Sequence, residues 1–111
     1  MANLYARYIK ERLGDEYIET DHGFATYRFL DDGKTVYIVD IYVIPEFRNQ
    51  RIASGIADRV VEIAKRRGAI ELIGTVSPRA NGATESMKAL LGYGMALKSA
   101  SSEVIVFGRA I

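Results

Sequence analysis

The stretch from Asp40 to Gly55 reads Asp-Ile-Tyr-Val-Ile-Pro-Glu-Phe-Arg-Asn-Gln-Arg-Ile-Ala-Ser-Gly. It takes the chain from the end of an apolar strand, through a proline and a polar loop, to the start of a helix. The first turn of a helix presents unpaired N–H groups and partial positive charge, which suits a phosphate. Arg48 and Arg51 add positive charge to this loop. From these residues alone, however, an ordinary strand-to-helix connection with two solvated arginines is the favoured interpretation.

The segments on either side of this stretch predict a parallel strand pair. Residues 35–44 are apolar on both faces and carry Asp40 as their only charge, which predicts a strand covered from both sides. Apolar residues at helical spacing predict a helix over 52–67, ended by Gly68. Residues 70–76 form another apolar strand candidate. A strand–helix–strand crossover of this kind joins parallel neighbours.

The rest of the chain predicts hairpins and two more helices. The expected elements are a helix over 3–13, strands over 17–20 and 24–30, a hairpin turn over 31–34, a helix over 84–91, and strands over 95–99 and 104–109. Met87, Leu90 and Leu91 are expected on the inner face of the helix over 84–91. Because hairpins are antiparallel, the sum is an α/β fold with a mixed sheet of about six strands and about three helices. We expect a single domain over residues 1–111.

Composition excludes several kinds of chemistry. The chain has 111 residues, no cysteine and one histidine, His22. Disulfides, thiolate metal sites and a cysteine nucleophile are therefore excluded, and we expect no zinc site and no serine–histidine triad. Fifteen basic against 14 acidic residues give a net charge of +1, which carries no signal for nucleic acid or for an anionic membrane.

The sequence also carries an expectation about location. No apolar run approaches the ~20 residues that span a bilayer. The start, Met1-Ala2-Asn3-Leu4, lacks the basic-then-apolar layout of a secretory signal. We expect a soluble, cytoplasmic protein.

The stretch quoted above resembles the acetyl-CoA-binding segment of the GNAT family of N-acetyltransferases. In that family an apolar strand, a proline, an acidic residue and an aromatic residue precede the pattern Arg/Gln-x-x-Gly-x-Gly/Ala, which opens a long helix. Here Pro45, Glu46 and Phe47 are followed by Arg48–Ala53. The pattern matches except that Arg51 stands at its central glycine.

The order of elements over residues 17–109 is also similar to the core of the family. The resemblance implies a GNAT-like fold that lacks the family's first strand and one of its two early helices. The helix over 3–13 would be the remnant of that region.

The resemblance implies a cofactor, acetyl-CoA or coenzyme A, and the residues that hold it. Backbone groups of Ile41, Tyr42 and Val43 would pair with the pantetheine arm as an added strand would. Backbone N–H groups of the next segment would surround the pyrophosphate, with Arg48 beside them: Asn49, Gln50, Arg51, Ile52, Ala53 and Ser54.

The departure at Arg51 leaves two outcomes open. A helical φ would make the substitution harmless, whereas a positive φ would distort the phosphate loop, because glycine adopts that conformation most readily. We expect Arg51 at or just inside the helix start, with its guanidinium toward the phosphates.

Acetyl transfer from a thioester to an amine needs three groups. A base must take a proton from the ammonium, whose pKa is about 10.4 in lysine. An N–H must stabilise the oxyanion, and the departing thiolate must receive a proton. The family tyrosine that often serves this last step falls on Leu90, and a usual asparagine falls on Ala83. Tyr93 is the nearest phenol and Asn81 the nearest amide.

Asp40 is the favoured base among Asp40, Glu46, Glu16 and His22. It is a lone carboxylate in a strand expected beside the thioester, and burial raises the pKa of a carboxyl. Strand alternation predicts that it shares a face with Ile38 and Tyr42. The alternative is a hydrogen-bonded structural aspartate near a splay in the sheet. Glu46 is expected in solvent, and His22 as a polar turn residue.

The resemblance implies an acetyl-CoA-dependent N-acetyltransferase that acts directly on a primary amine of a protein, a peptide or a small molecule. The alternative from another class is a catalytically inactive GNAT-like binding or structural module, which retains CoA or belongs to a larger assembly. An unrelated α/β domain without a ligand is the third possibility. Homodimer formation is open.

Overall fold

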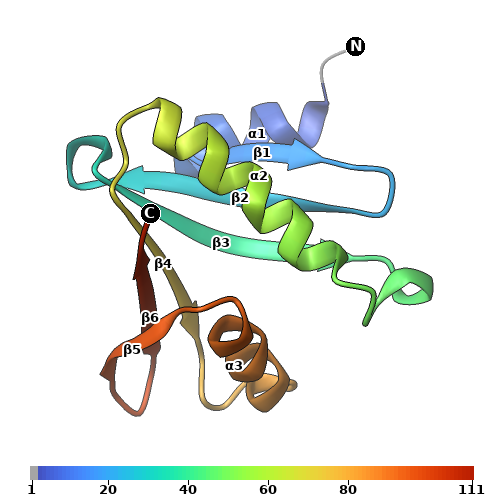
Figure 1. Ribbon diagram of the computed structural model, residues 1–111. Helices are drawn as coiled ribbons and strands as arrows, with labels where there is room; N and C mark the ends of the chain where they lie inside the picture. Colours follow the sequence, from blue (N-terminus) through green and yellow to red (C-terminus); the bar gives the residue numbers. More distant parts are fainter. Residues whose placement is uncertain (1–2) are drawn as a thin grey trace.

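The computed structural model describes residues 3–111 and shows one mixed sheet with helices on both faces (Figure 1). The helices are α1 (Leu4–Leu13), α2 (Ile52–Arg66) and α3 (Ala83–Gly92). The strands are β1 (Glu16–Glu19), β2 (Gly23–Leu30), β3 (Thr35–Val43), β4 (Glu71–Val76), β5 (Ala96–Ala100) and β6 (Ile105–Ala110). Met1 and Ala2, the start of the segment considered as a signal, lie outside the described residues.

The sheet has the order β1-β2-β3-β4-β6-β5, and only its β3–β4 pair is parallel. The predicted mixed sheet of six strands with three helices is confirmed, and the element bounds differ from prediction by a residue or two. The predicted turn over 31–34 contains a 3₁₀ turn at Asp31–Gly33, and a second one at Pro45–Phe47 follows β3.

Helix α1 begins and ends where the sequence predicts. Oδ1 of Asn3 accepts from the N–H groups of Tyr5 (2.8 Å) and Ala6 (3.2 Å), and Gly14 ends the helix in the left-handed conformation with φ of 73°. Ile9 is its buried residue, and the helix packs on β1 at one edge of the sheet.

Helix α2 covers the opposite face and builds the core. It crosses β2 and β3 in front of the sheet, with α1 behind β1 (Figure 1). Its inward stripe of small and branched residues packs on both strands: Ile56, Ala57, Val60, Val61 and Ala64.

The expectation that β3 is covered on both faces is wrong. Tyr42 is 41% exposed and Asp40 is exposed as well. The reason is that the ten-residue α1 lies over β1 and does not extend across the sheet to β3. One face of β3 thus borders solvent near its end.

A β-bulge changes which side chains share that open face. Thr26 pairs with Asp40, but the next residue, Tyr27, pairs with Ile38, so Val39 is the extra residue on β3. Asp40 therefore shares its face with Tyr42 but not with Ile38, which packs against the core. The predicted alternation is wrong at Ile38, because an inserted residue reverses the alternation beyond it.

Strands β3 and β4 pair at one end and separate at the other. Parallel pairing runs from Thr35–Glu71 to Ile38–Gly74 and then stops, although both strands continue. The half of the sheet with β4, β6, β5 and α3 diverges from the other half (Figure 1). This divergence opens the space described below.

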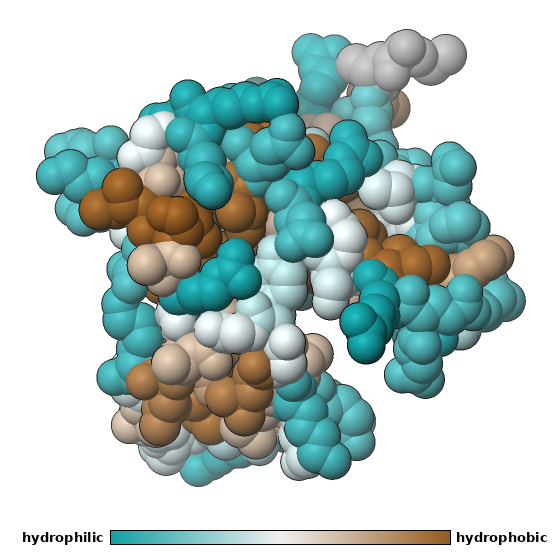
Figure 2. Space-filling view, in the orientation of Figure 1, coloured by the Kyte–Doolittle hydropathy of each residue, from teal (hydrophilic) through white to brown (hydrophobic). Residues whose placement is uncertain are grey.

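Helix α3 packs against the β4 side of this space. Met87 and Leu90 pack on the core as predicted, but Leu91 is 55% exposed, so its predicted inward position is wrong. Leu91 follows directly on Leu90, and α3 contacts the sheet along a narrow stripe on β4. The edge strand β5 is exposed along its length, and apolar side chains gather over this lower part of the molecule (Figure 2).

Within residues 3–111, no helix has both the length and the apolar character needed to cross a membrane.

Candidate active site

A cavity of about 310 Å³ occupies the space between the separated ends of β3 and β4. Two stripes of mostly small side chains border it, Ala53, Ser54 and Ala57 on α2 and Ser86 and Ala89 on α3. Its apolar lining comes from both strands, from α3 and from the connection between α3 and β5, and it includes Ile38, Ile41, Leu72, Ile73, Val76, Leu90 and Met95. This size falls in the range of sites for small organic molecules.

A second cavity of about 400 Å³ lies at the start of α2. Ile41, Ala53 and Ser54 line both cavities, so the two adjoin. Within residues 3–111, no acceptor bonds the N–H groups of Ile52, Ala53 and Ser54. Their unpaired donors and the dipole of the 15-residue α2 make this end of the space suited to an anion.

The loop before α2 holds two non-glycine residues with positive φ. Asn49 has φ of 65°, and Arg51, the residue just before α2, has φ of 63°. Arg51 thus stands at the helix start as predicted, in the conformation for which its glycine counterpart is suited. Of the two outcomes left open by the sequence, the positive φ is the observed one. Its side chain makes no capping hydrogen bond.

Arg48 lies back along β3. Its Nε donates to the carbonyl oxygen of Val43 at 2.9 Å, and its guanidinium lies 5.6 Å from the ring centre of Tyr42. One of the backbone acceptors expected to face a ligand is therefore engaged by Arg48. Gln50 is exposed, and its amide donates to the Glu46 carbonyl at 3.5 Å.

Asp40 lies where β3 and β4 separate, and it lines the first cavity. Within residues 3–111, no donor bonds its carboxylate, which removes support for a hydrogen-bonded structural role. Desolvation raises the pKa of Asp40, and the nearby negative charge of Asp15 adds to that rise. The carboxyl is partly desolvated, although the residue also reaches solvent. An available carboxylate with a raised pKa is a candidate base.

Two polar pairs near Asp40 could not be found from the sequence. Arg28 donates to the buried carboxylate of Asp15 through Nε (2.6 Å) and Nη2 (3.2 Å). The hydroxyls of Tyr37 and Thr75 lie 2.9 Å apart and join β3 to β4 at the point of separation. Both pairs join residues far apart in the chain, so no local pattern identifies them.

Tyr93, the phenol nearest in sequence to the position of the family's tyrosine, lines the first cavity. Its hydroxyl donates to Oδ1 of Asp58 at 2.6 Å. Desolvation raises the pKa of Tyr93 to about 12, and the hydrogen bond to Asp58 adds to this rise. Leu90 also lines the cavity, and its Cδ2 lies 3.3 Å from the place where a side chain on Gly74 would begin.

The other candidates lie elsewhere. Glu16 pairs with Lys10 and, at 3.6 Å, with Arg67. The ring of His22 packs on Phe47 with centres 3.8 Å apart. Three further residues do not line the first cavity: Glu46 and Asn81, both exposed, and Ala83, which is buried.

The site thus combines two parallel strands that separate, a helix start with unpaired N–H groups and a carboxylate without a donor. A family comparison of the sequence points to the same kind of protein. Residues 12–93 match the model of the acetyltransferase (GNAT) family. The chain belongs to this family.

Curated and solved proteins give further likenesses. Over 49 residues the chain is 39% identical to thialysine N-epsilon-acetyltransferase of Mus musculus, a match that covers 41% of this chain and 29% of that protein. The chain thus matches less than a third of the length of this relative.

Two solved structures share the fold. The PaiA N-acetyltransferase of Thermoplasma acidophilum, in complex with coenzyme A, has a TM-score of 0.75 at 13% identity, with 97% of this chain and 69% of that chain covered. A GNAT family acetyltransferase of Elizabethkingia anophelis with acetyl-CoA bound has a TM-score of 0.74 at 17% identity, with 99% and 86% covered.

Proposed function

We propose that this protein is an N-acetyltransferase that binds acetyl-CoA in the cleft between β3 and β4 and transfers its acetyl group directly to a primary amine. The observation that carries the proposal is the arrangement along one cleft. Unpaired N–H groups of α2 lie at one end, and the free carboxylate of Asp40 lies where β3 and β4 part. Family membership and the ligands bound in the two similar structures support it.

The residues present fit the cofactor. The N–H groups from Asn49 to Ser54 would surround the pyrophosphate, and the Arg48 and Arg51 guanidinium groups supply positive charge. Ile41, Tyr42 and Val43 continue β3 beyond its last pair with β4, so their backbone would accompany the pantetheine arm. The Val43 carbonyl would take part only if Arg48 releases it.

Bound acetyl-CoA supplies an acyl thioester, whose carbonyl carbon is attacked by the amine nitrogen as the carbon–sulfur bond breaks. The amine must first lose a proton, and we propose that Asp40 accepts it. A raised pKa makes the carboxylate a better base than a solvated aspartate. Asp40 lies on the face of β3 away from α2, so the acceptor would approach from that open face.

Tyr93 is the candidate donor of a proton to the leaving thiolate. Its raised pKa keeps the phenol protonated at neutral pH. In the structure its proton is directed to Asp58, so donation to sulfur requires the hydroxyl to turn.

A CoA-binding module without catalysis is the second candidate, and two observations favour it. By the sequence resemblance, Leu90 falls at the position of the family's tyrosine and Arg51 at that of its glycine, and Arg51 holds a left-handed backbone conformation. Fold alone does not decide between the two.

Thermal unfolding with ligand tests the shared part of both candidates. We expect acetyl-CoA to raise Tm in a concentration-dependent way, as a ligand of the native state does. No shift at millimolar acetyl-CoA, together with no heat in calorimetry, would remove both candidates. If binding is present, Asp40→Asn should lower kcat by about 10²-fold with little change in CoA affinity, and should abolish the acidic limb of the pH–rate profile.

A further inference from the structure

The hydroxyl of Tyr93 connects the two helices that border the cleft. It donates to Asp58 on α2 at 2.6 Å, and Tyr93 is the residue that ends α3. Tyr93 lines the cavity together with Ala57, while Asp58 follows Ala57 on the exposed rim of α2. The Tyr93 ring therefore passes beside the cavity and reaches α2.

The position of Tyr93 is fixed from the sheet below it. Nη1 of Arg109, on β6, donates to the Tyr93 carbonyl at 2.9 Å, and its guanidinium lies 4.7 Å from the ring centre. The N–H of Tyr93 donates to the carbonyls of Ala89 and Leu90. Movement of the phenol relative to β6 is thereby restricted.

Few other contacts hold α3 against α2. Among residues 3–111, the Tyr93–Asp58 bond is the one hydrogen bond between α2 and the segment 83–93. The side chains that face each other across the cavity are mostly small: Ala53, Ser54 and Ala57 on α2, and Ser86 and Ala89 on α3. The Tyr93–Asp58 bond is therefore the direct polar link between the two helices at this end, among the described residues.

We propose that Tyr93 and Asp58 form a clamp across the cleft. The clamp sets the width of the cleft and holds the pantetheine arm of acetyl-CoA, called the thiol arm below, in place. In the clamp they act as positioning residues for acyl transfer, a role distinct from the proton donation proposed for Tyr93, and this role rests on the proposed function above. The clamp acts on the thiol arm and not on the phosphates. The proposed phosphate site lies at the start of α2, next to Arg51, whereas Asp58 lies further along the helix.

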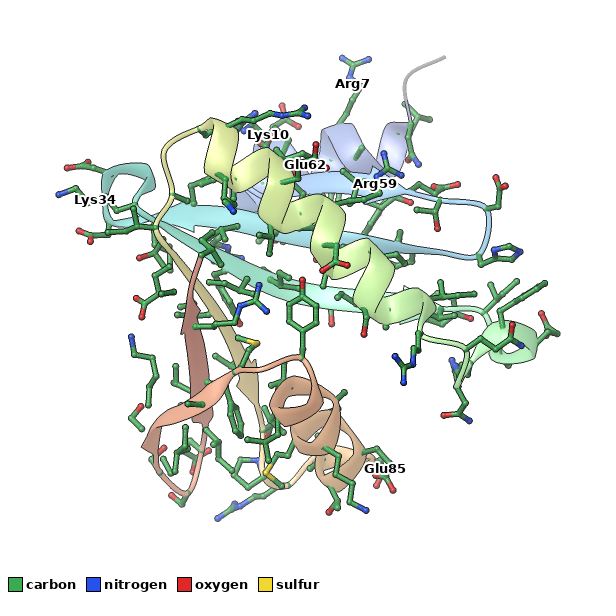
Figure 3. The ribbon with its side chains drawn as sticks, viewed as in Figure 1. Arg7, Lys10, Lys34, Arg59, Glu62 and Glu85 are labelled. Atoms are coloured by element: carbon green, nitrogen blue, oxygen red, sulfur yellow. The ribbon has the colours of Figure 1, made fainter. Side chains whose placement is uncertain are left out.

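The clamp is tested with two variants that break the bond and two that keep it. Tyr93→Phe and Asp58→Ala remove it, whereas Asp58→Asn keeps an acceptor oxygen. Glu62→Gln, one turn further along the outer surface of α2 (Figure 3), is the matched control. The measured quantities are the dissociation rate of CoA, the affinity for 3′-phospho-ADP, which lacks the thiol arm, and the KM and kcat for acetyl-CoA.

We expect Tyr93→Phe and Asp58→Ala to accelerate CoA dissociation about 3- to 10-fold and to raise KM for acetyl-CoA by a similar factor. Asp58→Asn should stay within about 2-fold of the unmodified protein, as should Glu62→Gln. Affinity for 3′-phospho-ADP should be unchanged in all four. Unchanged CoA dissociation in both bond-breaking variants would overturn the clamp and leave the proposed function standing, as would a loss confined to kcat in Tyr93→Phe.

Hydrogen exchange without ligand tests the clamp separately from the proposed function. If the protein does not bind CoA at all, the proposed function fails together with the clamp's hold on the ligand, and the remaining claim, that the bond holds α3 against α2, is judged from the free protein. Amides of α3 should exchange faster in Tyr93→Phe and Asp58→Ala than in Asp58→Asn and Glu62→Gln. Equal protection in all four variants would show that the bond does not hold α3.

Discussion

At the scale of single residues, Arg51 shows how backbone strain and charge act in opposite directions. Its φ of 63° is a conformation in which a non-glycine residue costs roughly 1–2 kcal/mol. Arg51 lines the cavity at the start of α2, where we propose that a phosphate binds. The same residue would therefore lower stability while it supports the proposed ligand binding.

Arg51→Gly should separate these two effects. We expect the free energy of unfolding to rise by about 1 kcal/mol, because glycine adopts positive φ without the steric cost. Affinity for CoA should fall about 3- to 10-fold, because the charge is lost. Denaturant unfolding and calorimetry measure the two quantities. Tighter binding in the glycine variant would show that Arg51 obstructs the phosphate site and would favour the non-catalytic module.

Asp40 makes a prediction about stability and pH. Desolvation raises its folded-state pKa above the ordinary value of 3.8, so the folded protein binds this proton more tightly than the unfolded chain. The proton on Asp40 therefore stabilises the folded state fully below the ordinary pKa, and this stabilisation is lost as the pH rises through the folded-state pKa. The quantity to compare is the Tm of Asp40→Asn minus the Tm of the unmodified protein. We expect this difference to be larger at pH 7 than at about pH 3. If the Tm of the variant minus that of the unmodified protein were smaller at pH 7 than at about pH 3, ionised Asp40 would stabilise the fold, which contradicts this prediction.

The buried carboxylate of Asp15 predicts a large loss of stability. Asp15→Ala leaves Arg28 without its partner, and we expect a loss of about 2–3 kcal/mol in denaturant unfolding. Glu62→Ala, which breaks the exposed Glu62–Arg66 pair, should cost less than about 0.5 kcal/mol. Equal losses in the two variants would contradict the structural importance of the buried pair.

At the scale of elements, the sequence predicts what is local and misses what depends on a partner. Asn3 and Gly14 delimit α1 as predicted, because caps act within one turn. The bulge at Val39 could not be predicted, because it is a property of the pairing between β2 and β3. The open face of β3 was missed for a similar reason, since it depends on how far α1 reaches across the sheet.

The candidate site divides in the same way. The loop from Arg48 to Ser54 could be located from its motif, and Asp40 from its position in the strand before it. The sequence could not determine the φ of Arg51. Asp58 was missed altogether, because its partner Tyr93 is 35 positions away and the two meet only when α2 and α3 pack across the cleft.

The β2–β3 hairpin makes a prediction at its open end. A Cβ on Gly23 would lie 2.1 Å from the Tyr42 carbonyl oxygen, a backbone atom that cannot move without moving β3. Gly23→Ala should therefore cost at least about 2–3 kcal/mol in denaturant unfolding. Gly55→Ala is the matched control, because its Cβ meets nothing within 4 Å and a helical position favours alanine by about 1 kcal/mol. If Gly23→Ala were as stable as the unmodified protein, the close approach of β2 to β3 would be wrong.

At the scale of the whole molecule, two halves of one sheet meet along the short β3–β4 pairing, and the cleft follows from their divergence (Figure 1). The start of α2, which we propose as the anion site, belongs to one half, and α3 with Tyr93 belongs to the other. The proposed cofactor site therefore takes residues from both halves, and in the proposed reaction the acceptor would approach Asp40 from the open face of β3.

Release of free thiol from acetyl-CoA in the presence of an amine tests the central claim most directly. The chain has no cysteine, so every thiol detected comes from CoA. The acceptors to be offered are lysine, peptide amino termini and small amines, with mass spectrometry to identify any acetylated product. The account predicts acceptor-dependent thiol release that Asp40→Asn reduces by about 10²-fold. Clear binding of CoA with no thiol release above background for any acceptor would contradict it and would identify the protein as a binding module.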